Sequence, residues 1–308
     1  QLVFQLDTAQ LESGIQDLSV KYPVFASLYF KELLGLSNSE DSTIAGLVPG
    51  LRDFLSDSLN RTLYQLAEQA YPPGKALSDE LLLSLKRLKY YFPQEREPIF
   101  YTLISGFSYG NFIFSDADGR DGIGIGLDFF LGEDFDYKKL DPRNPVFSEY
   151  LTRTFNRDHL QKKTWEAWVD DRLPEPASGQ FLDYMIHRGK KLYLLSKILP
   201  EIPDSVLFEY TPAQLEWCQT NRVEMWSFFL SKNLLYSTEL LKFNKYINPS
   251  PNAPGMPAEA PGRTGSYIGY CIVDAYMKKH PGTRLEELFK AGSGQEYLKA
   301  SGFKPRND

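Results

Sequence analysis

One stretch of the sequence carries part of the pattern of a metal-dependent hydrolase, at residues 180–200, QFLDYMIHRGKKLYLLSKILP. In a zinc peptidase, His-Glu-x-x-His on a helix places two imidazole ligands on one face, and the Glu acts as the general base. Here His187 takes the place of the first ligand, but Arg188 replaces the Glu and Lys191 replaces the second His. Because zinc needs neutral or anionic ligands, the stretch predicts neither a bound metal nor another cofactor.

The element that must position these side chains is predicted to be one helix. Ser178 and Gly179 precede the helix and Pro200 ends it. Its apolar positions recur at helical spacing: Leu182, Met185, Ile186, Tyr193, Leu194 and Ile198. A glycine inside a helix costs about 1 kcal/mol relative to alanine, so Gly189 indicates that another backbone packs closely there.

Two further motifs have simpler explanations than a ligand site. The run from Asp116 to Gly122 resembles the start of a calcium loop, but it lacks the bidentate Glu at the required spacing and is predicted to be a hairpin turn. Gly122, Gly124 and Gly126 lie within a strand pattern, not between a strand and a helix, so they indicate a close neighbour along the strand and no nucleotide loop. No Ser-His-Asp or Cys-His arrangement is legible, and no catalytic residue is assigned.

Composition narrows the class of protein. The 308 residues are 42% hydrophobic and 24% charged, as is typical of a globular domain, and the net charge of −6 argues against nucleic acid as a partner. No apolar run of 18 residues is present. Cys218 and Cys271 belong to no Cys-x-x-Cys pair, which leaves two buried free thiols or one disulfide. The start at Gln1 without Met suggests a processed boundary, with any export signal removed.

Segment patterns predict an α+β fold that is mainly helical, in a single domain over residues 1–308. Residues 1–97 are predicted to be helical, with one helix over 47–70. Residues 98–132 hold one small sheet of three or four strands, at 99–105, 111–115 and 123–130. Residues 147–308 are helical again, interrupted by a proline-rich loop over 248–261. Helices, then strands, then helices exclude an alternating α/β arrangement.

A set of strings resembles the GldB gliding-motility lipoproteins and covers most of the chain. The strings are Gly189-Lys190, Leu199-Pro200-x-x-Pro203-Asp204, Tyr210-Thr211-Pro212-x-Gln214-Leu215-x-Trp217-Cys218, Tyr246-Ile247-Asn248-Pro249 and Pro261-Gly262-Arg263-x-Gly265-x-x-Ile268-Gly269. The segment Gly126-Leu127-Asp128-x-Phe130-Leu131-Gly132 is similar to the same family.

This resemblance implies a zincin-like layout, shared with a wider group of predicted zinc peptidases, with a small sheet near the helix of residues 180–200. It also implies a lipid-anchored protein of a Gram-negative cell envelope, at the outer membrane or in the periplasm, linked to gliding motility or its associated secretion machinery. The chain departs from the active peptidases at Arg188 and Lys191. Peptidase activity is therefore not carried over, and the expectation is a pseudoenzyme.

The leading hypothesis is a non-catalytic scaffold or binding component with an envelope protein partner, or an extended peptide bound along a strand edge. The candidate residues of its cleft or polar network are Asp128, His187, Arg188, Lys190, Tyr193, Glu224, Arg263 and Tyr267. We expect Lys190 and Arg263 to lie close to one another or to the acids Asp128 and Glu224. The alternative is a hydrolase with a non-zinc site, in which Glu224 or Asp128 acts as the base.

Overall fold

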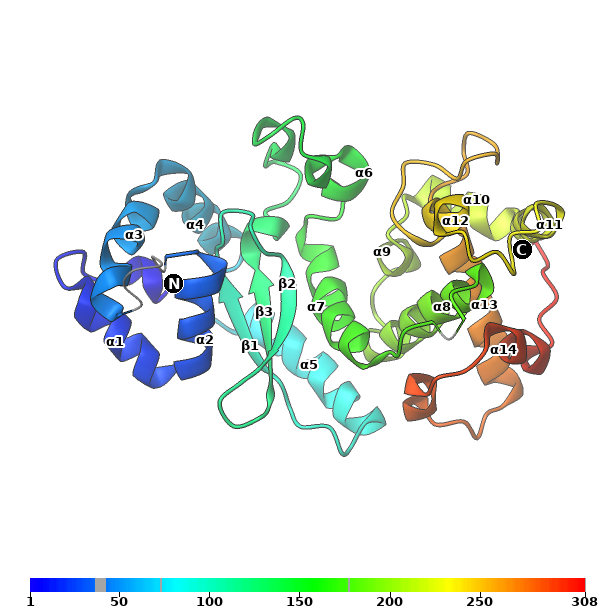
Figure 1. The fold of residues 1–308 in the computed structure, drawn as a ribbon, viewed down its shortest axis with the longest axis horizontal. Helices are drawn as coiled ribbons and strands as arrows, with labels where there is room; N and C mark the ends of the chain where they lie inside the picture. The colour runs from blue at the N-terminus through cyan, green and yellow to red at the C-terminus, as the bar shows by residue number, and fades with distance from the viewer. Residues whose placement is uncertain (37–42, 73, 177, 308) are drawn as a thin grey trace. The chain divides into compact units, whose positions relative to one another are not determined.

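The computed structural model describes residues 1–36, 43–72, 74–176 and 178–307, which form two compact units (Figure 1). The first unit comprises Gln1–Leu83, Gln94–Phe135 and Phe155–Trp168. The second comprises Ser84–Pro93, Asp136–Thr154 and Val169–Asp308. The chain therefore passes between the units more than once, within the long helices α5 (Lys75–Tyr91) and α7 (Arg157–Arg172) and in the segments around residues 93, 135 and 154.

The first unit begins with helices. They are the 3-10 turn η1 (Val3–Gln5), α1 (Leu11–Lys21), α2 (Pro23–Ser27), the π-helical segment η2 (Leu28–Leu33), α3 (Ile44–Ser56) and α4 (Ser58–Ala70). The expected single helix over 47–70 is wrong, because Asp57 interrupts it. Asp57 adopts an extended backbone, and its carboxylate accepts a hydrogen bond from the N–H of Asn60 at 2.8 Å, which caps the start of α4.

The hydrophobic core of these helices also includes one strand residue. Its buried members are Leu11, Ile15, Ala26, Tyr29, Phe30, Leu33, Leu47, Leu51, Leu55 and Leu103. Tyr29 is buried among them and donates its hydroxyl hydrogen to the carbonyl of Ile104 at 2.8 Å. That bond satisfies the phenol in an apolar setting and ties the helices to the end of the first strand.

The expected small sheet is present and has three strands. They are β1 (Ile99–Leu103), β2 (Asn111–Ser115) and β3 (Asp121–Gly126), in the order β1-β3-β2. The central strand β3 pairs in parallel with β1 and antiparallel with β2. The turn expected over residues 116–122 joins β2 to β3 but is shorter, because Asp121 and Gly122 belong to β3; the N–H of Asp116 donates to the carbonyl of Arg120 at 2.8 Å.

Glycines in β3 make room for aromatic rings, as expected. Gly122 pairs with Phe114 and Gly124 pairs with Phe112, and a Cβ at either glycine would lie about 2.2 Å from the facing ring. The rings therefore cover the strand where side chains would otherwise stand. The expected extension of this strand to residue 130 is wrong, since residues 127–130 form the 3-10 helix η3 (Leu127–Phe130).

The second unit is helical. It holds the 3-10 turns η4 (Tyr137–Lys139) and η5 (Pro145–Phe147), then α6 (Glu149–Thr152), α8 (Phe181–Ile198), α9 (Asp204–Phe208), α10 (Pro212–Thr220), α11 (Arg222–Ser231), α12 (Leu240–Ile247), α13 (Thr264–Lys279), η6 (Leu285–Phe289) and α14 (Gly294–Ser301). Thr211 and Gln214 form a capping box at the start of α10, as the Thr-Pro signal predicts. Residues 248–261 form the expected loop without helix or strand.

Helices α8 and α13 cross at two glycines, Gly189 and Gly269. A Cβ on Gly189 would lie 2.3 Å from the carbonyl carbon and oxygen of Gly269, and a Cβ on Gly269 would lie 1.8 Å from the carbonyl oxygen of Met185. The expectation that another backbone packs against Gly189 is therefore confirmed. All six apolar positions predicted for the helix of residues 180–200 are also buried.

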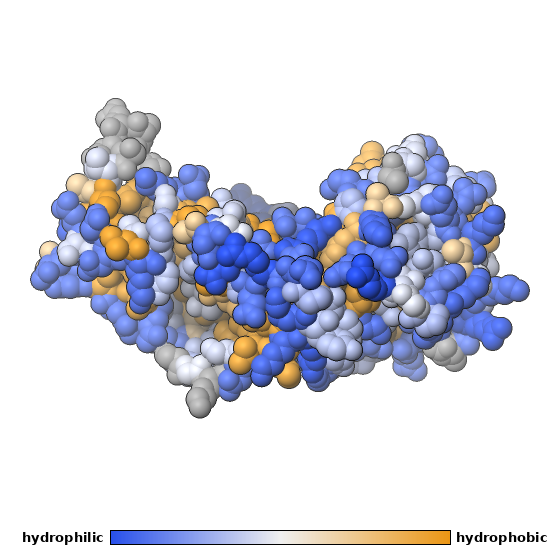
Figure 2. All heavy atoms as spheres, turned by 90° about the horizontal axis from the view of Figure 1, so that it is seen from below, coloured by the Kyte–Doolittle hydropathy of each residue, from blue (hydrophilic) through white to orange (hydrophobic). Residues whose placement is uncertain are grey.

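The structure confirms a mainly helical α+β fold. On the face seen in Figure 2, hydrophilic residues predominate and hydrophobic residues reach the surface in separate clusters. Among the described residues, no helix combines the length and apolarity needed to cross a membrane. Within the described residues, Cys218 and Cys271 form no disulfide, and Cys218 is buried.

Candidate functional site

Helix α8 carries the three residues of the degenerate motif, at positions 187, 188 and 191, each in a different setting. Arg188 donates from Nη2 to Oδ1 of Asn248 at 3.0 Å. Lys191, which stands where a second zinc ligand would be, forms an ion pair with Oδ2 of Asp170 at 3.1 Å. His187 is half-buried, and its Nδ1 lacks a hydrogen-bond partner within the described part of the chain. The two cations that replace the base and the second ligand therefore have partners of their own.

The electrostatic surroundings of His187 keep its imidazole neutral. Burial lowers the pKa of His187 most, and together with the charges of Arg188, Lys191 and Lys190, in that order, it brings the pKa to about 4. A dication at this imidazole would meet the same repulsion. In the regions covered by the structure, no group of three or more His, Cys, Asp or Glu side chains could hold a metal ion.

Lys190 contacts different residues from those that Arg188 contacts. It is buried, donates from Nζ to the carbonyl oxygen of Lys290 at 2.9 Å, and lies 4.4 Å from the ring centre of Tyr297 on α14. Burial lowers the pKa of the Lys190 ammonium to about 8. Tyr193, one turn further along α8, is buried with its ring 6.3 Å from that of Tyr270. Lys190 thus links α8 to the C-terminal part of the unit.

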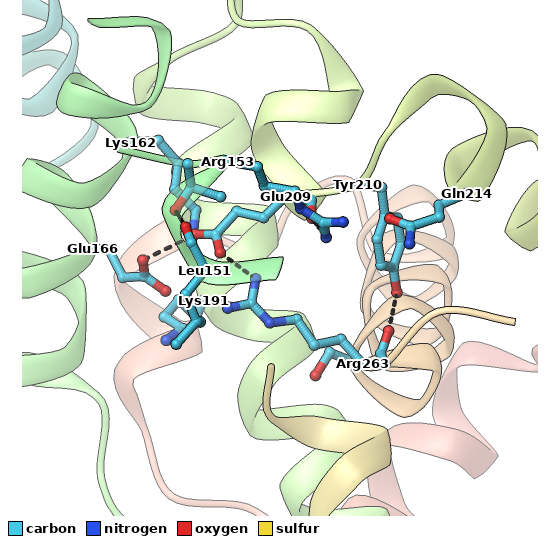
Figure 3. A network of polar contacts seen from close by, with 12 residues as sticks. Leu151, Arg153, Lys162, Glu166, Lys191, Glu209, Tyr210, Gln214 and Arg263 are labelled. Atoms are coloured by element: carbon cyan, nitrogen blue, oxygen red, sulfur yellow. Dashed lines mark hydrogen bonds and ion pairs between the residues drawn. The ribbon is translucent and has the colours of Figure 1, made fainter. Parts of the chain in front are cut away.

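Arg263 forms a buried ion pair with Glu209, a residue that sequence reasoning did not single out. Arg263 Nη1 lies 2.5 Å from Glu209 Oε2, and the two side chains are 19% and 4% exposed. Figure 3 shows the two side chains directed at one another. Both residues adopt a left-handed backbone, with φ of 61° at Arg263 and 55° at Glu209. Such a conformation costs a non-glycine residue on the order of 1 kcal/mol and is concentrated at functional or tightly constrained positions.

The surroundings of this pair come from α6, α9 and the start of α10. Arg153 donates from Nη2 to the backbone carbonyl of Glu209 at 2.7 Å, and Tyr210 donates its hydroxyl hydrogen to the carbonyl of Gly262 at 3.0 Å (Figure 3). Burial lowers the pKa of Arg153, and the nearby charge of Arg263 adds to the effect. The predicted cap at Thr211 places a helix start two residues after Glu209, which is the sequence signal nearest to this pair.

An open pocket lies along the exposed side of α13, further along the helix than Arg263. Its volume is about 610 Å³, and Tyr267 and Tyr270 form part of its wall. Arg222 donates to the Tyr267 hydroxyl from Nε at 3.0 Å and from Nη2 at 2.9 Å. Phe208 packs edge-on against both tyrosine rings. The charged residues of the wall are four cations and two acids: Arg222, Lys278, Lys304, Arg306, Asp204 and Asp274.

The two acids proposed as bases have other roles in the structure. Asp128 belongs to the first unit and is fully buried. Its Oδ2 accepts hydrogen bonds from the N–H of Ser105 at 3.0 Å, the Ser105 hydroxyl at 3.2 Å and the N–H of Phe107 at 2.8 Å. Burial raises the pKa of Asp128, although these donors oppose the shift. Glu224 belongs to the second unit, is exposed and accepts from Nδ2 of Asn307 at 3.1 Å.

The polar network expected from the sequence therefore forms only in part. The ion-pair partner of Arg263 is Glu209, not Glu224, and Lys190 binds a backbone carbonyl and an aromatic ring. Tyr267 lines the pocket beside α13.

The family model of the gliding motility protein GldB matches residues 1–305. No curated protein and no solved structure matches the chain.

Proposed function

Because the chain belongs to the family of the gliding motility protein GldB, we propose that it is a non-catalytic binding component of the gliding apparatus or its associated secretion machinery. In this proposal it is a lipid-anchored protein of the Gram-negative cell envelope. Its partner is an envelope protein that presents an acidic, extended segment to the pocket beside α13.

The pocket along α13 is the observation that carries the proposal. Its cations outnumber its acids by two, whereas the whole chain has a net charge of −6. Its aromatic wall offers flat apolar surface beside those charges, and arginine recognises carboxylates through paired, planar hydrogen bonds. A segment with carboxylates and apolar side chains would match both features. The volume of about 610 Å³ accommodates a few residues of such a segment.

The surroundings of His187 support a non-catalytic role. A general base must be close to the proton that it abstracts and have a pKa near the working pH. The pKa of His187, at about 4, is too low for efficient base catalysis near neutrality. Lys191, at the position of the second zinc ligand, is engaged by Asp170. These contacts favour a retained framework over a working active site.

The pocket is tested with a charge reversal at its exposed rim, Lys304→Glu with Arg306→Glu. A fluorescent peptide of alternating Glu and Phe serves as the probe, its Lys-Phe counterpart as the negative probe, and fluorescence anisotropy as the measurement. We expect the wild-type protein to prefer the acidic probe and the variant to lose at least tenfold in affinity. Lys139→Glu with Arg143→Glu, an equal charge change at exposed residues outside the pocket, is the matched control.

A second variant separates the pocket from the internal framework. Arg263→Ala removes an ion-pair partner from the buried Glu209 carboxylate, which we expect to lower the free energy of unfolding by about 3 kcal/mol. Binding of the acidic probe by the folded variant should be unchanged. If neither probe binds the wild-type protein, or if the rim and control variants bind equally, the proposed pocket function is wrong.

A further inference from the structure

A second surface of the same unit exposes large apolar side chains, at the end of α11, in the segment that follows it and at the start of α12. Leu230, Tyr236, Leu240 and Leu241 are 50%, 55%, 47% and 96% exposed. We call these four residues the leucine patch. Single exposed apolar residues are ordinary on protein surfaces, but four within a dozen residues of chain are not.

The fold does not need the leucine patch for its own packing. Helix α12 is held by its other face, where Phe243, Tyr246 and Ile247 are buried. The ring of Phe243 lies 5.1 Å from that of Phe181 on α8, and the ring of Tyr246 lies 5.6 Å from that of Phe229 on α11. Leu240 and Leu241 therefore point away from the side of the helix that stabilises it. Their apolar area is available for contact with something outside the chain.

Basic side chains surround the patch. Lys232, Lys242 and Lys245 are exposed there, and the acid Glu239 pairs with Lys242 at 2.5 Å. A hollow of about 420 Å³ beside the patch is lined by Lys232, Lys242, Glu239, Tyr236 and the amide of Asn233, among others. The local charge is thus positive on a chain whose net charge is −6. A binding partner of this surface should therefore offer both apolar groups and negative charge.

We propose that the leucine patch is a membrane-contact site, at which Leu240 and Leu241 enter the headgroup region and the lysines bind anionic lipid headgroups. Leucine beside lysine is the composition of interfacial segments, and tyrosine prefers the boundary between headgroups and acyl chains. A second copy of the chain would bring its own lysines against these lysines. Four apolar side chains also provide less than the roughly 800 Å² per partner of a stable protein interface. Contact here would orient the second unit at a lipid surface, independently of the pocket along α13.

Vesicle co-sedimentation tests the site with the full chain. The probes are vesicles of phosphatidylcholine alone and of phosphatidylcholine mixed with phosphatidylglycerol. We expect the wild-type protein to bind the anionic vesicles, and Leu240→Gln with Leu241→Gln to lose at least tenfold in the partition coefficient. Leu82→Gln with Leu83→Gln is the matched control, because these adjacent leucines on α5 are 47% and 48% exposed. That control should bind as the wild type does.

The charges are tested by Lys232→Glu, Lys242→Glu and Lys245→Glu, each of which should weaken binding to anionic vesicles about fivefold at low salt. Circular dichroism and thermal unfolding establish that the variants are folded. The proposal is wrong if the wild-type protein binds no anionic vesicles, or if the patch variants and the Leu82 and Leu83 control bind alike. It is also wrong if light scattering shows a dimer that the Leu240 and Leu241 substitutions dissociate, since the patch would then join two copies of the chain.

Discussion

Adding one methyl group at the crossing of α8 and α13 should destabilise the second unit. In Gly269→Ala, the new Cβ would lie 1.8 Å from the carbonyl oxygen of Met185, whereas real Cβ contacts are essentially never closer than 3.0 Å. Because the obstacle is backbone, no side-chain rotation can relieve the clash. The two helices must separate by more than about 1 Å at this point. That movement loosens the buried residues on either side, including Ile268 and Ile272.

The size of the effect follows from two opposing contributions. Overpacking of a tight interior costs about 1–3 kcal/mol where side chains can adjust, and more where they cannot. Alanine returns about 1 kcal/mol through its better helix propensity. We therefore expect Gly269→Ala to lower the free energy of unfolding by about 3 kcal/mol. For a unit of this size, that corresponds to a fall in Tm of about 6–12 °C.

Thermal unfolding followed by circular dichroism measures this change. Gly282→Ala is the control, because a Cβ there would meet nothing within 4 Å, and its Tm should stay within about 2 °C of the wild-type value. Gly189→Ala should also destabilise, since its Cβ would lie 2.3 Å from the carbonyl of Gly269. The two effects should not add, because both act at one crossing. If Gly269→Ala unfolds at the temperature of the Gly282 control, the close approach of the backbones is refuted.

Three further predictions concern the candidate residues. The pKa of His187 is lowered to about 4 in the folded state, whereas an unfolded histidine has a pKa of about 6.5. As the pH falls from about 6.5 to about 4, the unfolded chain binds this proton and the folded chain does not, so the free energy of unfolding should fall by up to about 3 kcal/mol. Urea titrations at several pH values should show a smaller loss in His187→Gln. Asp128→Ala should destabilise the first unit by about 3 kcal/mol, because Ser105 loses a buried hydrogen-bond acceptor. Asp128→Asn should cost less, because the amide oxygen can still accept a hydrogen bond. Equal urea midpoints for the two variants would contradict this. After zinc loading and desalting, elemental analysis should find far less than one zinc per chain, because Arg188 and Lys191 place positive charge near His187. One zinc per chain that is lost in His187→Ala would contradict this prediction.

Several features of this protein follow from the sequence alone. The apolar spacing of residues 180–200 predicted α8, and Thr211 and Pro212 predicted the start of α10. Concentration of β-forming residues between positions 99 and 130 predicted the sheet. These inferences succeed because hydrophobic periodicity, capping and turn preferences act between residues close together in the chain. The co-occurrence of short strings likewise identified the GldB family.

Local breaks were harder to predict from the same patterns. The expected helix over 47–70 is divided at Asp57, whose side chain satisfies a helix start inside an otherwise continuous apolar pattern. The strand after Gly126 turns into the 3-10 helix η3, where Asp128 accepts hydrogen bonds from the segment around Ser105. In both places one polar side chain outweighs the periodicity of its neighbours, and periodicity alone does not say which polar residue will do so.

Only the tertiary structure decided the partners of the charged residues. Arg263 pairs with Glu209 across 54 positions of sequence, and Lys190 binds the carbonyl of Lys290 across 100. Lys190 lies on α8 and Arg263 lies at the start of α13, and these two helices approach each other closely at Gly189 and Gly269. A glycine in a sequence indicates that a close approach is possible, but the approaching backbone is selected by the packing of the whole unit. The identity of each charge partner therefore emerges only when the helices are assembled, because ion pairs form between neighbours in space.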